Sequence, residues 1–326
     1  MNFKKKLLII ISFLIMLFPF SVYAYSDKVI LGGDNIGISV NIKEILVVGF
    51  YKVNDKYIAS EAGFAIGDKI IKVNNNEVNN IESLVKEIKN NDGETVAITV
   101  LRDNEEKEFN LTLVKDGDNY KTGLYIKDQI TGIGTLTYID PESKVFASLG
   151  HEIADNKTGK IIDISKGFIF DSTIKGIIKS TPISTGEKRA IFNQNSINGI
   201  ILKNTNKGIF GEYKSEINSD NLIEVGEIDE IELGPATIYT VLDNKEIQEF
   251  DINIIKINED SETKNILFEI TDEELMNNTN GVIKGMSGSP IVQNNKIIGA
   301  VTHAIINDNS KGYGIFVVKM LEEGDK

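Results

Sequence analysis

Short stretches in which apolar and polar residues alternate dominate this chain, and stretches with the spacing of an amphipathic helix are few. Strand-like runs occupy residues 95–102 and 108–113, whereas three apolar residues share one face of a predicted helix at residues 81–89. Later in the chain, turn residues separate the short runs at Asn156, Gly167, Gly176, Gly186, Gly199, Gly211 and Gly234. This regular spacing predicts a mainly β protein with an all-β barrel or a pair of barrels.

The first half of the chain carries a long, specific pattern. Residues 62–74 read Ala-Gly-Phe-x-x-Gly-Asp-x-Ile-x-x-Val-Asn, and they precede the predicted helix and the two strands. This run resembles a PDZ domain, an α+β fold, which we place at residues 31–115. Such domains add an extended peptide to a sheet edge and hold its terminal carboxylate in a loop of backbone N–H groups. The resemblance implies that Asn35, Ile36, Gly37 and Ile38 form this peptide-binding loop, although a PDZ fold can also serve only as a packing module.

A polar, Gly-containing segment at residues 116–122 marks a domain boundary, and a new β-rich pattern continues to the end of the chain. We therefore expect a second domain at residues 120–326. A length of 326 residues agrees with two domains and is enough to bury a sizeable core.

The N-terminal 24 residues have the layout of a bacterial secretory signal. Three lysines at residues 4–6 precede an apolar run at residues 7–20, and small residues lead to Ala24. Cleavage is expected after Ala24. The alternative is an uncleaved anchor at residues 7–24, because this length approaches the ~20 residues that span a bilayer. Either way, the protein is expected to be exported across a membrane.

Composition excludes several classes of function. A formal charge of −13 argues against nucleic acid and anionic membrane surfaces as partners. The absence of cysteine rules out disulfides, cysteine-ligated zinc and a cysteine nucleophile. The chain has no phosphate-binding loop, dinucleotide fingerprint or His-Glu-x-x-His motif, so we expect no metal and no organic cofactor.

A turn of small residues at 285–290, Gly-Met-Ser-Gly-Ser-Pro, is the best candidate for chemistry. Serine peptidases present their nucleophile in such a turn, and the N–H groups of Gly285 and Ser287 could converge on one oxygen as negative charge develops there. Two β-rich runs follow, joined by an Asn-rich turn at residues 294–296, which predicts a hairpin. The segment resembles the nucleophile segment of trypsin-like peptidases. The alternative is an ordinary Gly/Ser β-turn.

The chain has only two histidines, and any imidazole base must be one of them. His151 follows a small-residue strand end and precedes Ser287, which is the order of base and nucleophile in trypsin-like peptidases. His303 lies in the predicted hairpin, where that resemblance implies a wall of the substrate cleft. We therefore assign His151 as the base.

The leader, the PDZ-like pattern, Gly150-His151 and the 285–291 segment together resemble the sporulation stage IV protein B peptidases of endospore-forming bacteria. The resemblance implies a serine endopeptidase with His151 as base, Asp272 as acid and Ser287 as nucleophile. The alternative for Asp272 is a structural or helix-capping role. Trypsin-like chains place the acid midway between base and nucleophile, which leaves four other candidates open: Asp155, Asp163, Asp171 and Asp220.

The family resemblance also implies a physiological role. Such an enzyme processes itself and, in the space between the two forespore membranes, cleaves a regulatory subunit of an intramembrane protease. That cleavage leads to activation of a late mother-cell sigma factor. The main alternative is a non-catalytic PDZ receptor with a degenerate peptidase-like domain, and an esterase is a weaker one because a PDZ domain implies a peptide client.

Overall fold

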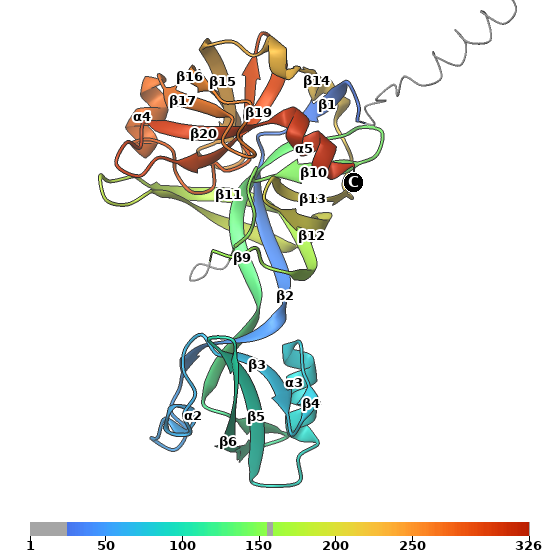
Figure 1. Cartoon of the computed structure of the whole chain (residues 1–326), viewed down its shortest axis with the longest axis vertical. Coiled ribbons are helices and arrows are strands. Elements are labelled where there is room, and N and C mark those ends of the chain that lie inside the picture. The colour runs from blue at the N-terminus through green and yellow to red at the C-terminus, as the bar shows by residue number, and fades with distance from the viewer. Residues whose placement is uncertain (1–24, 155–158, 326) are drawn as a thin grey trace, which may run out of the picture.

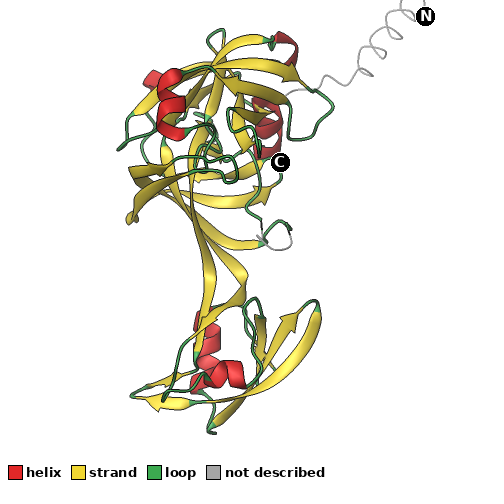
Figure 2. Cartoon of the chain, turned by 90° about the vertical axis from the view of Figure 1, so that its left-hand side faces the viewer, coloured by secondary structure: helices red, strands yellow, loops and turns green. Residues whose placement is uncertain are grey.

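A computed structural model describes residues 25–154 and 159–325. The predicted leader at residues 1–24 and the candidate acid Asp155 lie outside these ranges. Within them, no helix combines the length and the apolar character needed to cross a bilayer. The described chain forms two units joined by two long strands, β2 and β9, as the two views in Figure 1 and Figure 2 show.

The smaller unit is the PDZ domain, and it combines short helices with a twisted sheet. It takes the distal half of β2 (Asn35–Phe50) and the beginning of β9 (Leu124–Ile139). Between them lie α2 (Ile58–Glu61), β3 (Lys69–Val73), β4 (Asn76–Glu77), α3 (Ile81–Lys89), β5 (Thr95–Arg102), β6 (Glu105–Thr112), β7 (Val114–Asp116) and β8 (Asn119–Lys121). One apolar cluster, which includes Ile45, Ile70, Leu84, Ile98 and Leu111, fills its interior.

Local chemistry sets the limits of α3. Asn80 caps its N-terminus by accepting from the Ser83 N–H at 2.7 Å, and Ser83 returns a bond to the Asn80 N–H. The buried residues Leu84 and Ile88 then face the sheet. Elsewhere in this unit, Arg102 donates to both carboxylate oxygens of the buried Asp68, at 2.6 and 2.7 Å. This paired contact ties β5 to the turn before β3.

The larger unit is built almost entirely of strands. Its N-terminal lobe contains β1 (Lys28–Leu31), the proximal part of β2, most of β9, β10 (Val145–Ser148), β11 (Ile164–Ile178), β12 (Glu187–Thr205), β13 (Gly208–Tyr213), η1 (Ser219–Asn221) and β14 (Leu222–Val225). Its C-terminal lobe contains η2 (Ile228–Glu230), β15 (Gly234–Val241), β16 (Ile247–Ile257), β17 (Ile266–Ile270), α4 (Glu273–Thr279), β18 (Pro290–Gln293), β19 (Lys296–Ala304), β20 (Lys311–Phe316) and α5 (Val317–Gly324).

Each lobe has its own apolar core. Ile36, Phe146 and Ile169 belong to the N-terminal core, and Ile238, Phe268 and Phe316 belong to the C-terminal one. A third cluster, in which α5 packs on strands of both lobes, joins them. The predicted hairpin is β18–β19, and Asn294 and Asn295 between its strands have φ values of 52° and 61°. Two left-handed residues in a row give the turn twist that a two-residue hairpin needs.

These features confirm the prediction of a mainly β chain, and α3 spans the residues predicted for the helix. The N-terminal boundary of the PDZ domain differs from the one predicted at residue 31. Residues 28–31 form β1 and residues 35–41 the first part of β2, and both lie in the larger unit, where β2 pairs with β9 and β11. The PDZ domain is thus inserted between β2 and β9 (Figure 1).

The expected peptide-binding loop at Asn35, Ile36, Gly37 and Ile38 is therefore corrected. All four residues are buried in β2 and pair with β9 on one edge, and Ile36, Gly37 and Ile38 also pair with β11 on the other. The Asn35 side chain donates to Ser172 Oγ at 2.8 Å. The alternation of Ile36, Ile38 and Val40 is that of a strand whose apolar side chains enter the N-terminal core. A backbone already paired on both edges has no N–H groups left for a peptide carboxylate.

Gly37→Val should destabilise the larger unit. A Cβ at residue 37 would lie 2.5 Å from Phe192 Cβ, and overpacking of this kind costs about 1–3 kcal/mol. The control is Gly132→Val on the paired strand, because a Cβ there meets nothing within 4 Å. Thermal melting should show a lower Tm for the Gly37 variant than for the Gly132 variant. An unchanged Tm together with lost peptide capture would restore the loop.

Candidate active site

His151 and Ser287 meet where the two lobes of the larger unit face each other. His151 follows β10 of the N-terminal lobe, and Ser287 precedes β18 of the C-terminal lobe. The distance from His151 Nε2 to Ser287 Oγ is 2.9 Å, which is hydrogen-bonding distance. The fold thus brings together the two residues that the sequence nominated as base and nucleophile, across 136 positions of chain.

A strained backbone presents His151. Leu149 and Gly150 have φ values of 71° and 67°, and a left-handed conformation is costly for a branched residue such as leucine. The Leu149 side chain is buried in the N-terminal core, which holds the backbone in this conformation. The chain therefore turns sharply after β10 and points the imidazole at Ser287.

The other ring nitrogen of His151 faces a main-chain acceptor. Nδ1 lies 2.8 Å from the Glu152 carbonyl oxygen, which can only accept, so in this arrangement Nδ1 carries the proton. Nε2 is then the lone-pair nitrogen that faces Ser287. Burial lowers the pKa of His151 below its ordinary 6.5, although the Glu152 carbonyl acts in the opposite direction. The imidazole is consequently neutral at neutral pH, as a general base must be.

Two glycines shape the turn that carries Ser287. Gly285 and Gly288 have φ values of 95° and 92°, which other residues rarely adopt. Gly288 also packs directly on β9, because a Cβ there would lie 2.1 Å from the Thr135 carbonyl oxygen. No side chain larger than a hydrogen fits at this position.

The peptide groups on either side of the turn are fixed through their carbonyls. The Lys284 carbonyl accepts from the Lys188 N–H at 3.0 Å, and the Met286 carbonyl accepts from the Ser289 N–H at 2.9 Å. In a trans peptide the N–H points away from the C=O, so the N–H groups of Gly285 and Ser287 point the opposite way. No acceptor for either N–H occurs among the described residues. Both donors are available to an oxyanion.

The Ser287 hydroxyl has two possible acceptors. Besides His151 Nε2, the Thr302 carbonyl of β19 lies 2.9 Å from Ser287 Oγ. A hydroxyl has one proton, and only its donation to Nε2 prepares the oxygen for attack. His303 lies on the same strand as Thr302, with its ring centroid 4.9 Å from that of His151. His303 therefore lies beside the base.

The structure does not bring Asp272 to His151. Its carboxylate accepts from the Leu275 N–H at 2.8 Å and caps α4. Among the other candidates, Asp163 pairs with Lys43 and Asp171 pairs with Lys245, while Asp220 is exposed in η1. Of the described residues, no carboxylate side chain is hydrogen-bonded to His151. The Glu152 carbonyl is the group that orients the ring.

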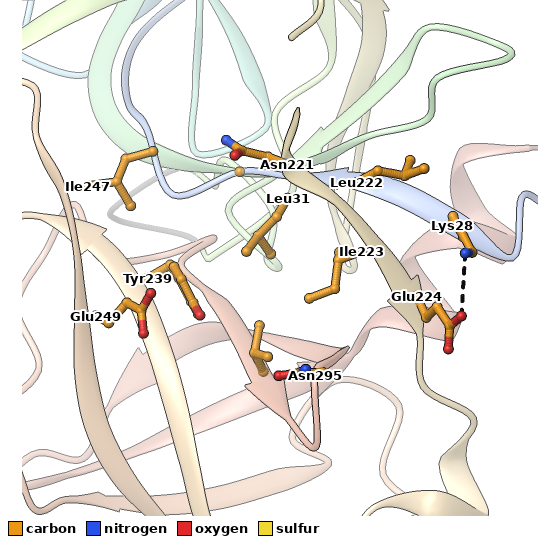
Figure 3. A pocket seen from close by; sticks show the side chains of 12 residues that line it. Lys28, Leu31, Asn221, Leu222, Ile223, Glu224, Tyr239, Ile247, Glu249 and Asn295 are labelled. Carbon is orange, nitrogen blue, oxygen red and sulfur yellow. Dashed lines mark ion pairs between the residues drawn. The ribbon is translucent and has the colours of Figure 1, made fainter. Parts of the chain in front are cut away.

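A pocket of about 590 Å³ lies elsewhere on the larger unit. Figure 3 shows it between β1, β14 and the β18–β19 turn, with Lys28, Ile223, Tyr239, Glu249 and Asn295 among its lining residues. None of the lining residues belongs to the turn that carries Ser287. In the part of the chain that the structure describes, no three His, Asp or Glu side chains gather as metal ligands.

Several residues around the site gave no signal in the sequence. Thr135 and Thr240 occur in ordinary alternating strands, and Lys188 follows Glu187 in a polar stretch typical of a surface strand. All three are buried within reach of the Ser287 turn. Only long-range pairing places them there, so local patterns could not have identified them.

Comparison with protein-family models agrees with the two domains. The family model described as SpoIVB peptidase S55 matches residues 118–321, and a PDZ domain model matches residues 35–113. No curated protein matches the chain. Among solved structures, the active form of the Rv3671c protease from M. tuberculosis is 13% identical, with a TM-score of 0.32, over 59% of this chain and 71% of that chain. The inactive form is 13% identical, with a TM-score of 0.29, over 57% of this chain and 80% of that one.

Substitutions of Asp272 separate a helix cap from a catalytic acid. Asn caps helices as well as Asp does, so Asp272→Asn should retain both stability and turnover. Asp272→Ala should lower the free energy of unfolding by roughly 1 kcal/mol and leave kcat within a few-fold of wild type. Thermal melting and cleavage of casein measure the two effects. A collapse of turnover in a normally stable Asp272→Asn protein would show instead that this carboxylate orients His151.

Proposed function

The chain belongs to the SpoIVB peptidase S55 family and is a serine peptidase with a PDZ domain, and we propose that it is an exported endopeptidase that uses Ser287 and His151 to cleave a protein regulator. The observation that supports this assignment best is the 2.9 Å contact between His151 Nε2 and Ser287 Oγ. Beside it lie the N–H groups of Gly285 and Ser287, which have no acceptor in the described part of the chain. Those are the parts that peptide hydrolysis by a serine requires.

The proposed reaction follows from this geometry. Ser287 Oγ attacks the carbonyl carbon of the scissile bond while its proton passes to His151 Nε2. The N–H groups of Gly285 and Ser287 then hold the oxyanion. Protonated His151 donates that proton to the leaving amine, which leaves an acyl group on Ser287. Water attacks the acyl group by the same proton route and restores the free hydroxyl.

The physiological role that we propose is the one that family membership suggests. The enzyme would cleave a regulatory subunit of an intramembrane protease, so that a late mother-cell sigma factor becomes active during endospore formation. A location in the forespore intermembrane space fits the secretory layout of residues 1–24, whether Ala24 marks a cleavage site or residues 7–24 remain as an anchor. Purified protein should therefore cleave that subunit in vitro.

Self-processing, which is also proposed, is restricted by the fold. Tyr25 and Val29 are buried, and β1 pairs with both β9 and β14. A cut within residues 28–41 would fall in strands that belong to the N-terminal lobe and would be inaccessible without local unfolding. We therefore place the self-cleavage site before Lys28.

Peptide capture by the PDZ domain is proposed at a different edge from residues 35–38. Residues 124–127 of β9 pair with β2 on one side, and no described strand pairs with their other side. The helix α3 lies beside this edge, and Asp128 accepts from the Ile81 N–H at its start. A peptide could add there as a further strand. Slower amide hydrogen exchange at residues 124–127 on addition of the cleaved regulator would support this edge.

Ser287→Ala and His151→Ala should each abolish casein cleavage and fluorophosphonate labelling, with losses on the order of 10⁴ or more. Because the two residues act as a unit, the double variant should be no worse than either single variant. His303→Ala is the matched control and should retain measurable turnover.

N-terminal sequencing should show processing before Lys28 that is missing in Ser287→Ala. Normal labelling of Ser287→Ala would transfer the nucleophile to another residue, and a wild-type protein that is never labelled would favour a non-catalytic PDZ receptor.

A further inference from the structure

Lys188 is a buried lysine next to the turn that carries Ser287. It lies near the start of β12 and is only 3% exposed, whereas lysine is almost never fully buried without a partner of opposite charge. Its amine donates to Thr240 Oγ1 at 2.7 Å, and it forms no ion pair with any described residue. Burial lowers the pKa of Lys188 to about 7. The reaction described above assigns no role to this side chain.

A chain of buried hydroxyl groups connects the Lys188 amine to the turn. Ser289 Oγ lies 3.0 Å from the same Thr240 oxygen and 3.4 Å from Thr135 Oγ1, and its single proton serves one of these two contacts. Thr135 Oγ1 in turn donates to the Gly285 carbonyl at 2.8 Å. Ser289, Thr240 and Thr135 are each completely buried. A row of buried polar groups, each within 3.4 Å of the next, thus runs from β12, through β15 and the turn, to β9.

Lys188 also contacts the turn directly. Its main-chain N–H donates to the Lys284 carbonyl and so sets the direction of the Gly285 N–H. Its aliphatic stem packs on Gly285, because a Cβ at that glycine would lie 3.1 Å from both Lys188 Cβ and Lys188 Cδ. Lys188 therefore supports the peptide group of Gly285 through its main-chain N–H, its aliphatic stem and its amine.

We propose that Lys188 is a positioning residue for catalysis, which holds the turn of Gly285 and Ser287 in its oxyanion-binding conformation through its main chain, its stem and its amine. This inference rests on the proposed role of Ser287. The amine must be uncharged to fit, since a buried ammonium with one hydroxyl partner would be largely unsatisfied. Lys188 does not touch the substrate.

No neighbouring charge shifts the protonation of the Lys188 amine, so burial alone sets its pKa. Glu187 and Arg189 beside it on β12, and Lys284 on the facing segment, are exposed. β15 and β9 present the hydroxyl groups of Thr240 and Thr135 to the row of polar groups, and no charged group contributes to the pKa of Lys188 beside its burial. Below about pH 7 the amine gains a proton, the cation disrupts this row, and the turn loses its catalytic conformation.

The lowered pKa of Lys188 also makes the folding stability depend on pH. The folded-state pKa of about 7 lies below the ordinary 10.5, so the unfolded chain binds more protons between these two values. The contribution of Lys188 to folding stability therefore rises with pH through this window and is smallest below it. A Lys188→Met protein lacks this titration but retains most of the apolar stem.

The test compares Lys188→Met and Ser289→Ala with wild type in casein cleavage across pH 5–9. Lys188→Met should lower kcat about tenfold at pH 8 with little change in KM, because oxyanion stabilisation acts on the transition state. Wild type should lose activity in two protonation steps on the acid side, one near pH 7 from Lys188 and one lower from His151. Lys188→Met should show only the lower step. Ser289→Ala should lose kcat but retain both steps, since its lysine still titrates.

Wild-type kcat and an unchanged two-step profile in Lys188→Met would overturn the proposal. If that variant fails to melt cooperatively, Thr240→Val replaces it, and a normal kcat in folded Thr240→Val would overturn the proposal equally. Ser287→Ala in the same assay distinguishes the two levels of inference. Activity that remains in Ser287→Ala would contradict the role of Ser287 as nucleophile. If Ser287→Ala is inactive but Lys188→Met and Thr240→Val keep the wild-type kcat, only the positioning role of Lys188 is contradicted.

Discussion

The site depends on the hydrogen bonds by which β9 of the N-terminal lobe holds a turn of the C-terminal lobe. The Thr135 N–H donates to the Ser287 carbonyl at 2.9 Å, and the hydroxyls of Thr135 and Thr137 donate to the carbonyls of Gly285 and Gly288, each at 2.8 Å. These bonds are buried, so each is expensive to leave unmade. They fix the main chain around the nucleophile relative to the strand that leads to β10 and His151.

The same strand connects the two units of the protein. β9 begins in the PDZ domain, beside the edge where a peptide could add, and ends in the sheet that supports the Ser287 turn. An inserted PDZ domain held by two continuous strands has less freedom than one attached through a flexible linker. A peptide partner at residues 124–127 would thus bind to the strand that carries Thr135.

The base is oriented in a way that family resemblance did not suggest. A main-chain carbonyl next to His151 takes the position that an aspartate side chain occupies in a Ser-His-Asp triad. A carbonyl can select the tautomer, as a carboxylate does, but it has no negative charge to stabilise the imidazolium. Asp272, the residue implied by the family pattern, stabilises α4 instead.

How much the sequence could predict depended on the range of each interaction. The α3 helix, the Asn294–Asn295 hairpin and the glycines at 285 and 288 follow from local rules, and all were visible in short windows. His151 was identified because histidine is scarce in this chain. Residues 35–38 were misplaced because a Gly-containing segment just before a PDZ pattern resembles the first loop of that domain. The strands that pair with these residues, β9 and β11, lie far along the chain. Lys188 gave no signal at all, since burial of a charged residue is decided by the fold.

Catalysis by this site requires that neutral His151 carries its proton on Nδ1, toward Glu152, and offers Nε2 to Ser287. Nitrogen-15 NMR of histidine-labelled protein measures this directly, and the two histidines can be assigned with the His303→Ala variant. At pH 8 we predict a protonated Nδ1 and an unprotonated Nε2 for His151, with the same spectrum in Asp272→Asn. A proton on Nε2, or a change of tautomer when Asp272 is replaced, would contradict the account.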